Sequence, residues 1–132
     1  MGQQQEQYVP QVQPVYVGEQ VQMGTGLGGM RPIAQSGKVY LAGGELVLVG
    51  TQGQLLDRAP VSQVTWKKTW YTMGSVIFVT LGGERRYSLG IKTGGLMLLT
   101  GAARVFMGNS AGKTFVEALT QEQARLAGVP TA

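Results

Sequence analysis

The chain contains neither cysteine nor histidine. Without cysteine there is no disulfide framework and no thiolate metal site, so a reducing compartment is permitted. The usual nucleophiles, proton shuttles and soft-metal ligands are therefore missing, and only seven Asp and Glu remain for acid–base chemistry or for binding hard cations. We predict a protein that is not an enzyme and that holds no metal or cofactor.

Basic leader segments and long apolar runs are also lacking. The first basic residue is Arg31, and no apolar segment precedes it, so the N-terminus does not match a secretory signal. Glu6 stands where a myristoylation motif has Ser or Thr. The longest apolar stretch, Gly94 to Gly108, contains Arg104 and is shorter than the roughly 20 residues that cross a bilayer. We expect a cytoplasmic protein, with a peripheral position at the membrane left open.

Glutamine, proline and glycine dominate the first 35 residues, where valine and tyrosine occur singly, as in Tyr8-Val9-Pro10. Such a composition buries too little apolar surface to offset the entropy of ordering. We therefore predict a disordered tail and linker over residues 1–35, with Met23 to Pro32 as the linker, and one β-rich domain over residues 36–132. A solvated leader is favoured over a tethering or docking arm.

From Gly37 onward, short apolar runs alternate with glycine-containing turns at a spacing of roughly ten residues. This pattern predicts an antiparallel meander, and Gly82-Gly83 is its clearest two-residue hairpin turn, because both positions tolerate positive φ. The expected strands are Lys38–Leu41, Glu45–Val49, Gln54–Arg58, Val61–Tyr71, Ser75–Leu81 and Arg85–Ile91.

The last third of the chain is harder to assign. The apolar segment Gly94 to Asn109 fits a helix, a loop or a further strand equally well. A helix is expected from about Ala111, with one apolar stripe formed by Phe115, Ala118 and Leu119. It either continues to Leu126 or breaks at residues 120–123, which read as a capping box.

Particular residues accompany this order of meander and helix, in five segments: residues 37–41, 46–49, 54–64, 86–89 and 115–119. Together they resemble the pleckstrin-homology-like superfold, most closely its GRAM-like and bacterial branch. The resemblance implies a mainly β (α+β) small barrel capped by a C-terminal helix and used for phosphoinositide or peptide contacts, although a fold alone does not fix the ligand. A seventh strand between Ile91 and the helix is not evident, so an SH3-type or OB-type barrel stays open.

Positive charge is concentrated in the predicted domain, which holds all but one of the eleven Lys and Arg. Basic and aromatic side chains alternate around residues 66–71, a pattern that suits anionic head groups or stacked bases. If the Thr72 to Ser75 and Gly82-Gly83 turns set the register, Lys67 lies opposite Thr80, and the lysines and arginines meet at one end of the sheet. The competing interpretation is a solvated strand end with packed tryptophans. The candidate binding residues are Trp66, Lys67, Lys68, Trp70, Tyr71, Arg85 and Arg86.

Residues 105–114 look like a strand that runs into a phosphate-binding loop. The first glycine of such a loop would stand where Met107 stands, and too few residues follow Thr114 for a nucleotide-binding sheet. We therefore predict no nucleotide site and read Asn109 or Ser110 as a helix N-cap.

The apolar stretch before the helix has two interpretations. If half of it is exposed, it forms a docking or dimer surface. If it is buried, it takes the place of the strand that is not evident between Ile91 and the helix. Its candidate interface residues are Leu96, Met97, Leu98, Leu99, Val105, Phe106 and Met107.

Three functions follow from the sequence. The first is a non-catalytic interaction module for a protein partner or an anionic lipid surface. The second is a small-barrel binder of single-stranded nucleic acid, which is the less favoured partner. The third is a structural subunit that assembles into a homo-oligomer.

Overall fold

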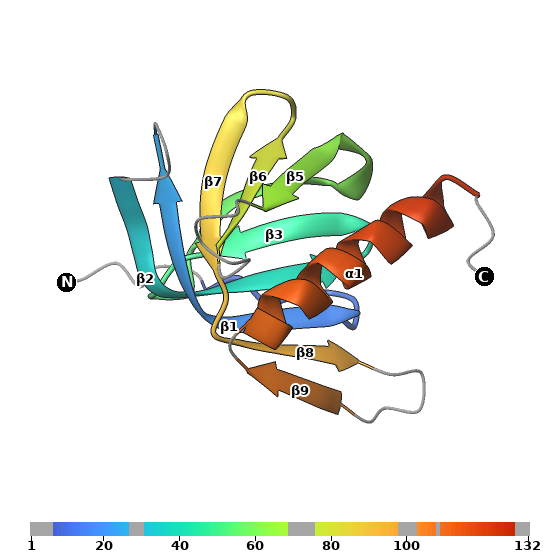
Figure 1. The fold of residues 1–132 in the computed structure, drawn as a ribbon, viewed down its shortest axis with the longest axis horizontal. Coiled ribbons are helices and arrows are strands. Elements are labelled where there is room, and N and C mark those ends of the chain that lie inside the picture. The colour runs from blue at the N-terminus through green and yellow to red at the C-terminus, as the bar shows by residue number, and fades with distance from the viewer. Residues whose placement is uncertain (1–6, 27–30, 69–75, 98–102, 108, 129–132) are drawn as a thin grey trace.

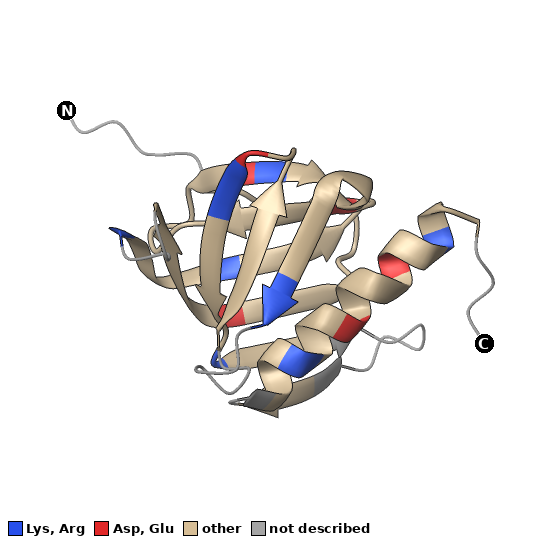
Figure 2. Ribbon diagram, turned by 45° about the horizontal axis from the view of Figure 1, so that its top comes forward, with Lys and Arg blue, Asp and Glu red and all other residues tan. Residues whose placement is uncertain are grey.

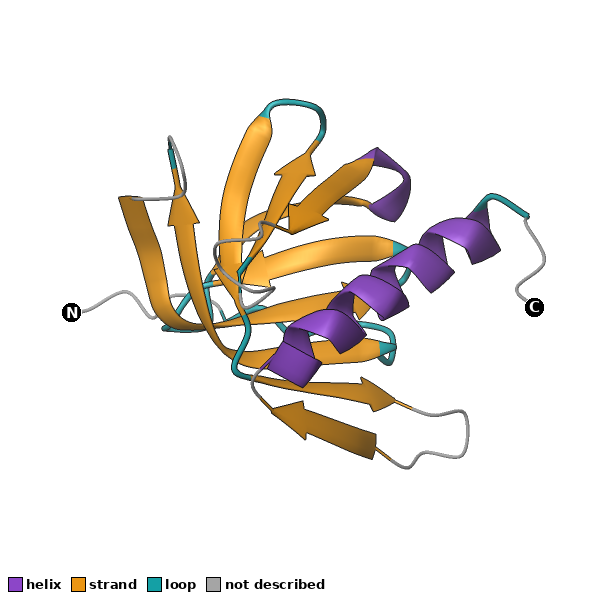
Figure 3. Ribbon diagram, in the orientation of Figure 1, coloured by secondary structure: helices purple, strands orange, loops and turns teal. Residues whose placement is uncertain are grey.

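A computed structural model describes residues 7–26, 31–68, 76–97, 103–107 and 109–128 of the chain. In this part of the chain, nine antiparallel strands form one strongly curved sheet, and one helix lies across its open side (Figures 1 and 3). The strands are β1 (Tyr16–Thr25), β2 (Arg31–Ala42), β3 (Glu45–Val49), β4 (Leu55–Pro60), β5 (Val64–Lys68), β6 (Ile77–Leu81), β7 (Arg85–Gly90), β8 (Thr93–Met97) and β9 (Ala103–Met107). A 3₁₀ turn spans Val61–Gln63, and the helix α1 spans Asn109–Leu126.

The predicted meander is confirmed. The strands follow the order β4-β3-β2-β1-β7-β6-β5, and β8 joins β1 on the same edge as β7 and pairs with β9. Glycines turn the chain where the sequence predicts, since Gly43, Gly44, Gly82 and Gly83 all have positive φ. The expected strand from Val61 to Tyr71 is interrupted at its start by the 3₁₀ turn, and its last residues, 69–71, lie outside the described part.

The strand β1 holds the two halves of the sheet together. Its first half, from Tyr16 to Glu19, pairs with β8, and its second half, from Gln22 to Thr25, pairs with β7, while β2 runs along its other edge. Gln20 lies between the halves with φ of 54°, at a register shift in the β1–β2 ladder. An extra residue of this kind bends a strand, which lets β1 belong to both halves.

The prediction of a disordered tail through residue 35 is therefore wrong for β1 and for the start of β2. Tyr16, Val21 and Met23 of β1 are buried in the core. The inward residue is even-numbered before Gln20 and odd-numbered after it, because the bulge adds one residue. That change of phase hides the alternation that would have identified a strand.

The segment left open in the sequence, Gly94 to Asn109, is the hairpin β8–β9 leading into α1. The helix is continuous from Asn109 to Leu126, so of the two alternatives that the sequence left open, the continuous helix holds and the break at residues 120–123 does not occur. Thr120 instead donates its hydroxyl to the carbonyl of Val116, one turn earlier, at 2.8 Å. The strand that was not evident between Ile91 and the helix is therefore present, as β8 and β9, and a further strand that the sequence did not predict, β1, precedes the meander.

The helix is fixed to the sheet through Tyr16. The Tyr16 hydroxyl donates to the carbonyl of Ala111 at 2.9 Å, and its ring centroid lies 5.5 Å from that of Phe115. A side chain at Gly94, on the neighbouring strand β8, would collide with the Tyr16 hydroxyl. The helix thereby closes the barrel over β1, β8 and the 3₁₀ turn.

Residues 7–15, which we call the N-terminal arm, run over the outer face of β2 and β3. The Tyr8 N–H donates to the carbonyl of Gly53, the Val15 N–H donates to that of Leu41, each at 2.7 Å, and the Tyr8 and Tyr40 ring centroids are 5.8 Å apart. Tyr40 pairs with Val47 on the outer face, whereas Leu41 pairs with Leu46 toward the core.

Candidate functional site

The predicted meeting of basic residues at one end of the sheet does not occur. In the ladder of β5, β6 and β7, Lys67 lies opposite Phe78, which lies opposite Ser88, whereas Arg86 lies opposite Thr80, which lies opposite Thr65. The lysines are at the far tip of β5 and the arginines at the start of β7, at opposite ends of these strands (Figure 2). The predicted register, with Lys67 opposite Thr80, is wrong by two residues, because Lys67 pairs with Phe78 and Lys68 pairs with Ile77. Trp70 and Tyr71 lie outside the described residues.

Alternation divides the basic residues between the two faces of the sheet. Val64, Leu81 and Leu89 are buried in the barrel, so residues of the same parity on their strands face inward. Lys68 and Arg85 have this inward parity, whereas Lys67 and Arg86 lie on the outer face. On these two described strands, no lysine and arginine therefore share both the same face and the same end of the sheet, so no such pair is placed to hold one phosphate.

Arg85 is engaged by an acidic side chain. Its Nε donates to Asp57 Oδ2 at 2.7 Å, and the Tyr87 hydroxyl donates to the same oxygen, also at 2.7 Å. The Arg58 N–H donates to Asp57 Oδ1 at 2.7 Å. Burial raises the pKa of Asp57, but the hydrogen bonds from Arg85, Tyr87 and the Arg58 main chain together lower it below its ordinary value of 3.8. Arg85 is therefore a structural residue that links β7 to β4.

Arg86 is exposed at the start of β7. The other candidates that the structure describes lie on β5, which pairs with β6 alone in the described part of the chain. The Gly82 N–H donates to the carbonyl of Gln63 at 3.0 Å, which makes residues 63, 65 and 67 the hydrogen-bonded positions toward β6. The main-chain groups of Val64, Trp66 and Lys68 consequently point away from β6, toward the free edge.

Gln123 of α1 closes the beginning of this free edge. Its side-chain amide donates to the carbonyl of Val64 at 2.7 Å and to that of Val61 at 2.9 Å. Beyond this anchor, Trp66, Lys67 and Lys68 are exposed, with 37% of Trp66 accessible. We call Trp66–Lys68 the β5 edge.

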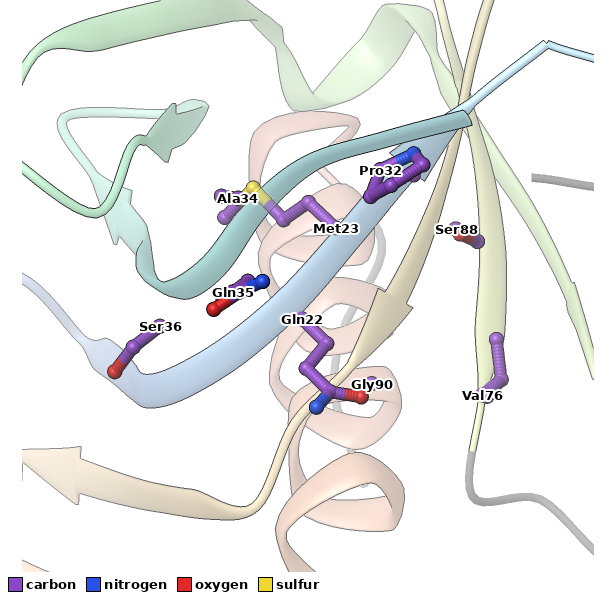
Figure 4. Close-up of a pocket in the computed structure, with 10 residues that line it drawn as sticks. Gln22, Met23, Pro32, Ala34, Gln35, Ser36, Val76, Ser88 and Gly90 are labelled. Atoms are coloured by element: carbon purple, nitrogen blue, oxygen red, sulfur yellow. The ribbon is translucent and has the colours of Figure 1, made fainter. Parts of the chain in front are cut away.

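Among the grooves of the described residues, two contain no residue of the β5 edge. One, of about 720 Å³, is lined by uncharged residues that include Gln22, Gly24, Gln35, Ser36, Val76 and Gly90 (Figure 4). The other, of about 590 Å³, lies between the N-terminal arm and the ends of β2 to β4, where Glu45 and Arg58 supply its charges.

The predicted apolar interface divides between the two faces of the hairpin β8–β9. Phe106 packs against the core, whereas Val105 and Met107 are 67% and 74% exposed. Leu96 and Met97 belong to β8, and Leu98 and Leu99 lie outside the described residues. The stretch therefore has both an exposed and a packed side chain on β9, and a docking or dimer role for it stays a prediction.

Three residues of this region were not singled out from the sequence. Asp57 and Tyr87 occupy inward positions of their strands, and a charged residue at an inward position is a signal that alternation could have given. Gln123 gave no such signal, because its two acceptors lie about 60 residues away in the chain.

No protein-family model matches this chain, and no curated protein is significantly similar to it. Among solved structures, it is similar to the solution structure of the PH domain of human TBC1 domain family member 2 protein. The TM-score is 0.53 at 10% identity, over 98% of this chain and 94% of that one. The chain therefore has a pleckstrin-homology-like fold, as its resemblance implied, while the closer GRAM-like assignment stays a prediction.

Two features are absent from the described residues. Within the described residues, no helix has the length and apolar character needed to cross a bilayer. The same residues contain no group of three or more acidic side chains placed to hold a metal ion.

Proposed function

We propose that this protein is a non-catalytic interaction module that binds an extended, acidic segment of a protein partner along the β5 edge. The observation that carries the proposal is the free edge of β5 beside two exposed lysines and a partly exposed tryptophan. A peptide that adds a strand to such an edge gains affinity from main-chain hydrogen bonds and selectivity from side-chain contacts.

The chemistry of the edge defines the partner. Trp66 and Lys68 offer main-chain N–H and C=O groups in the direction in which an added strand would lie. Lys67 and Lys68 form no ion pair within the described part of the chain, so both are available to carboxylates. An indole beside them favours a partner strand that also carries an apolar or aromatic residue.

A peptide fits this site better than a flat lipid surface does. Because neighbouring side chains of a strand point to opposite faces, Lys67 and Lys68 flank the edge from two sides. A peptide strand that pairs with the β5 edge can contact both lysine side chains, whereas a flat lipid surface can contact only one of them. The other free cations are spread over several elements and form no single face (Figure 2).

The test is amide hydrogen exchange of the full chain, measured by NMR with and without a set of extended Val/Glu-containing peptides. We expect fast exchange at Trp66 and Lys68 in the free protein and protection of both amides when an acidic peptide is bound. Lys67, whose N–H points to β6, is the internal control. Protection elsewhere, with no change at Trp66 and Lys68, would refute the proposal.

A charge variant separates this function from its rivals. The double substitution Lys67→Glu/Lys68→Glu should abolish binding of acidic peptides. The control substitution Lys38→Glu, at an exposed position of β2, should leave this binding unchanged. Tryptophan fluorescence should show no matching response to anionic vesicles or to single-stranded oligonucleotides. If vesicles bind and peptides do not, the module is a membrane binder; if oligonucleotides alone bind, it is a nucleic-acid binder.

A further inference from the structure

A second apolar surface lies on the outer face of the sheet, separate from the core. Three buried residues of β2 and β3 do not belong to the core cluster, because their side chains leave the sheet on the opposite side from Leu46 and Leu48. Tyr40 lies beside Val47, and Leu55 beside Val49, on this same side. The outer apolar face, as we call it, consists of Tyr40, Ala42, Val47, Val49 and Leu55.

The N-terminal arm covers one part of the outer apolar face. It is tied at its start by the hydrogen bond and the ring contact of Tyr8, and at its end by the hydrogen bond of Val15. Between these ties, residues 9–14 form no main-chain hydrogen bond within the described part of the chain, and two of them are prolines, which have no N–H. The arm can therefore leave the sheet without breaking a continuous ladder of hydrogen bonds.

The groove of about 590 Å³ lies between the arm and the β4 side of this face. Val9, Val12 and Leu55 line it and are 71%, 53% and 44% exposed. Its charged lining residues, Glu45 and Arg58, form an ion pair of 3.8 Å with each other. The apolar surface thus extends beyond the arm, and the groove offers no net charge to a partner.

We propose that the outer apolar face is a second binding site, which takes an extended, uncharged segment of a partner protein that carries tyrosine, valine and proline. The arm is the resident occupant of this site and shows the chemistry that the site accepts, since residues 7–15 contain tyrosine, three valines, two prolines and no charge. A partner segment that also covers Leu55 buries apolar surface that the arm leaves in water, and so displaces the arm. The site lies on other strands than the β5 edge and does not depend on it.

The first test is an NMR titration of the full chain with a synthetic peptide that has the sequence of residues 7–15. As the peptide binds, the amide of Tyr8 should lose its protection from hydrogen exchange, because its bond to the carbonyl of Gly53 opens. The amide of Leu46, on a strand that is paired on both sides, is the internal control. Binding that leaves Tyr8 protected would refute the displacement of the arm.

A weakened arm tests the competition directly. A tethered segment competes at a high effective concentration, so any loss of its own contacts favours the added peptide. Tyr8→Ala removes the ring contact with Tyr40 and should raise the apparent affinity for the peptide about two- to tenfold. No binding by this variant, or an affinity equal to that of the unsubstituted chain, would overturn the proposal.

The second test locates the site. Leu55→Glu places a charge in the uncharged groove and should weaken peptide binding at least about tenfold. Leu126→Glu, at a leucine of similar exposure at the end of α1, should bind the peptide as the unsubstituted chain does. Equal affinities of the two variants would place the peptide elsewhere and contradict the proposal.

The mass of the full chain distinguishes a partner segment from the arm of a second copy. Sedimentation equilibrium should give 14.1 kDa at every concentration, in keeping with the repulsion between chains that each carry a net charge of +4. A dimer that the added peptide dissociates would mean that two copies exchange their arms, and would replace the proposed partner.

Discussion

Tyr87 of β7 donates its hydroxyl hydrogen to Asp57 of β4 at 2.7 Å, although these strands lie far apart in the order of the sheet. The bond therefore joins strands that are not neighbours in the sheet, and Arg85 of β7 donates to the same carboxylate oxygen. One carboxylate with two side-chain donors thus links β4 to β7. The strength of this link must depend on the charge of Asp57.

The first prediction concerns acid. Because the folded-state pKa of Asp57 lies below its ordinary value of 3.8, its contribution to stability is fully present above that value and is lost as pH falls through the folded pKa. Asp57→Asn should therefore lower the free energy of unfolding by about 1–2 kcal/mol at neutral pH and much less under strongly acidic conditions. Urea unfolding at several pH values measures this difference. A loss that is the same at every pH would show that the charge of Asp57 is unimportant.

The second prediction concerns alkali and the same bond. Burial and the hydrogen bond to Asp57 raise the pKa of Tyr87 from 10.0 to about 12. The neutral phenol is therefore favoured in the folded state, and its stabilisation is present below pH 10.0 and lost as pH rises toward about 12. Tyr87→Phe should cost about 1 kcal/mol at neutral pH and remove this part of the alkaline loss. Tyr8→Phe is the control, since its ring lies on the N-terminal arm.

The third prediction tests the contact between β8 and the Tyr16 hydroxyl. Gly94→Ala should destabilise the fold by about 1–3 kcal/mol, because its new methyl group overlaps that hydroxyl. Tyr16→Phe alone should cost about 1 kcal/mol through loss of the hydrogen bond to Ala111. The double variant should lose less stability than the sum of the losses of the two single variants, since removing the hydroxyl relieves part of the overlap. Strictly additive costs would mean that the two residues do not compete for space.

The sequence predicts a strand well when buried and exposed residues alternate without interruption along its whole length. The strand Glu45–Val49 was predicted with its observed bounds, and the glycine turns on either side of it are as expected. The strand β1 was missed because the bulge at Gln20 reverses the parity of its buried residues. The arm was missed for another reason, since its contacts with Leu41 and Gly53 lie far along the chain.

The candidate site could be predicted only in part, because the residue types are local but their neighbours are set by register. The lysines of β5 are exposed, as a binding role requires. Their distance from the arginines depends on the register between β5 and β6, which sequence does not give. The role of Arg85 as a partner of Asp57 depends on how the curved sheet closes, a property of the whole barrel.

The fourth prediction concerns Gln123, which joins the end of α1 to the beginning of β5. Gln123→Ala removes the donor to the carbonyls of Val61 and Val64, and should lower the free energy of unfolding by about 1–2 kcal/mol. Gln121→Ala, on the exposed side of the same helix, should change it little. Equal effects of the two substitutions in urea unfolding would mean that only helix propensity is being measured.

The last prediction concerns the N-terminal arm. Val47 and Val49 have 0% and 1% exposure although they lie on the outer face of β3, and the arm crosses the neighbouring strand there, with Tyr8 against Tyr40. Deleting residues 1–14 should expose apolar surface and lower the free energy of unfolding by about 1.5–3 kcal/mol, which is the free energy of burying one such side chain. Binding of a hydrophobic dye should rise together with the loss of stability. Deleting residues 1–6 alone is the matched control, because the hydrogen bond from Tyr8 to Gly53 is then retained. If the longer deletion changes neither dye binding nor stability, the arm is a passive leader and other residues bury the valines.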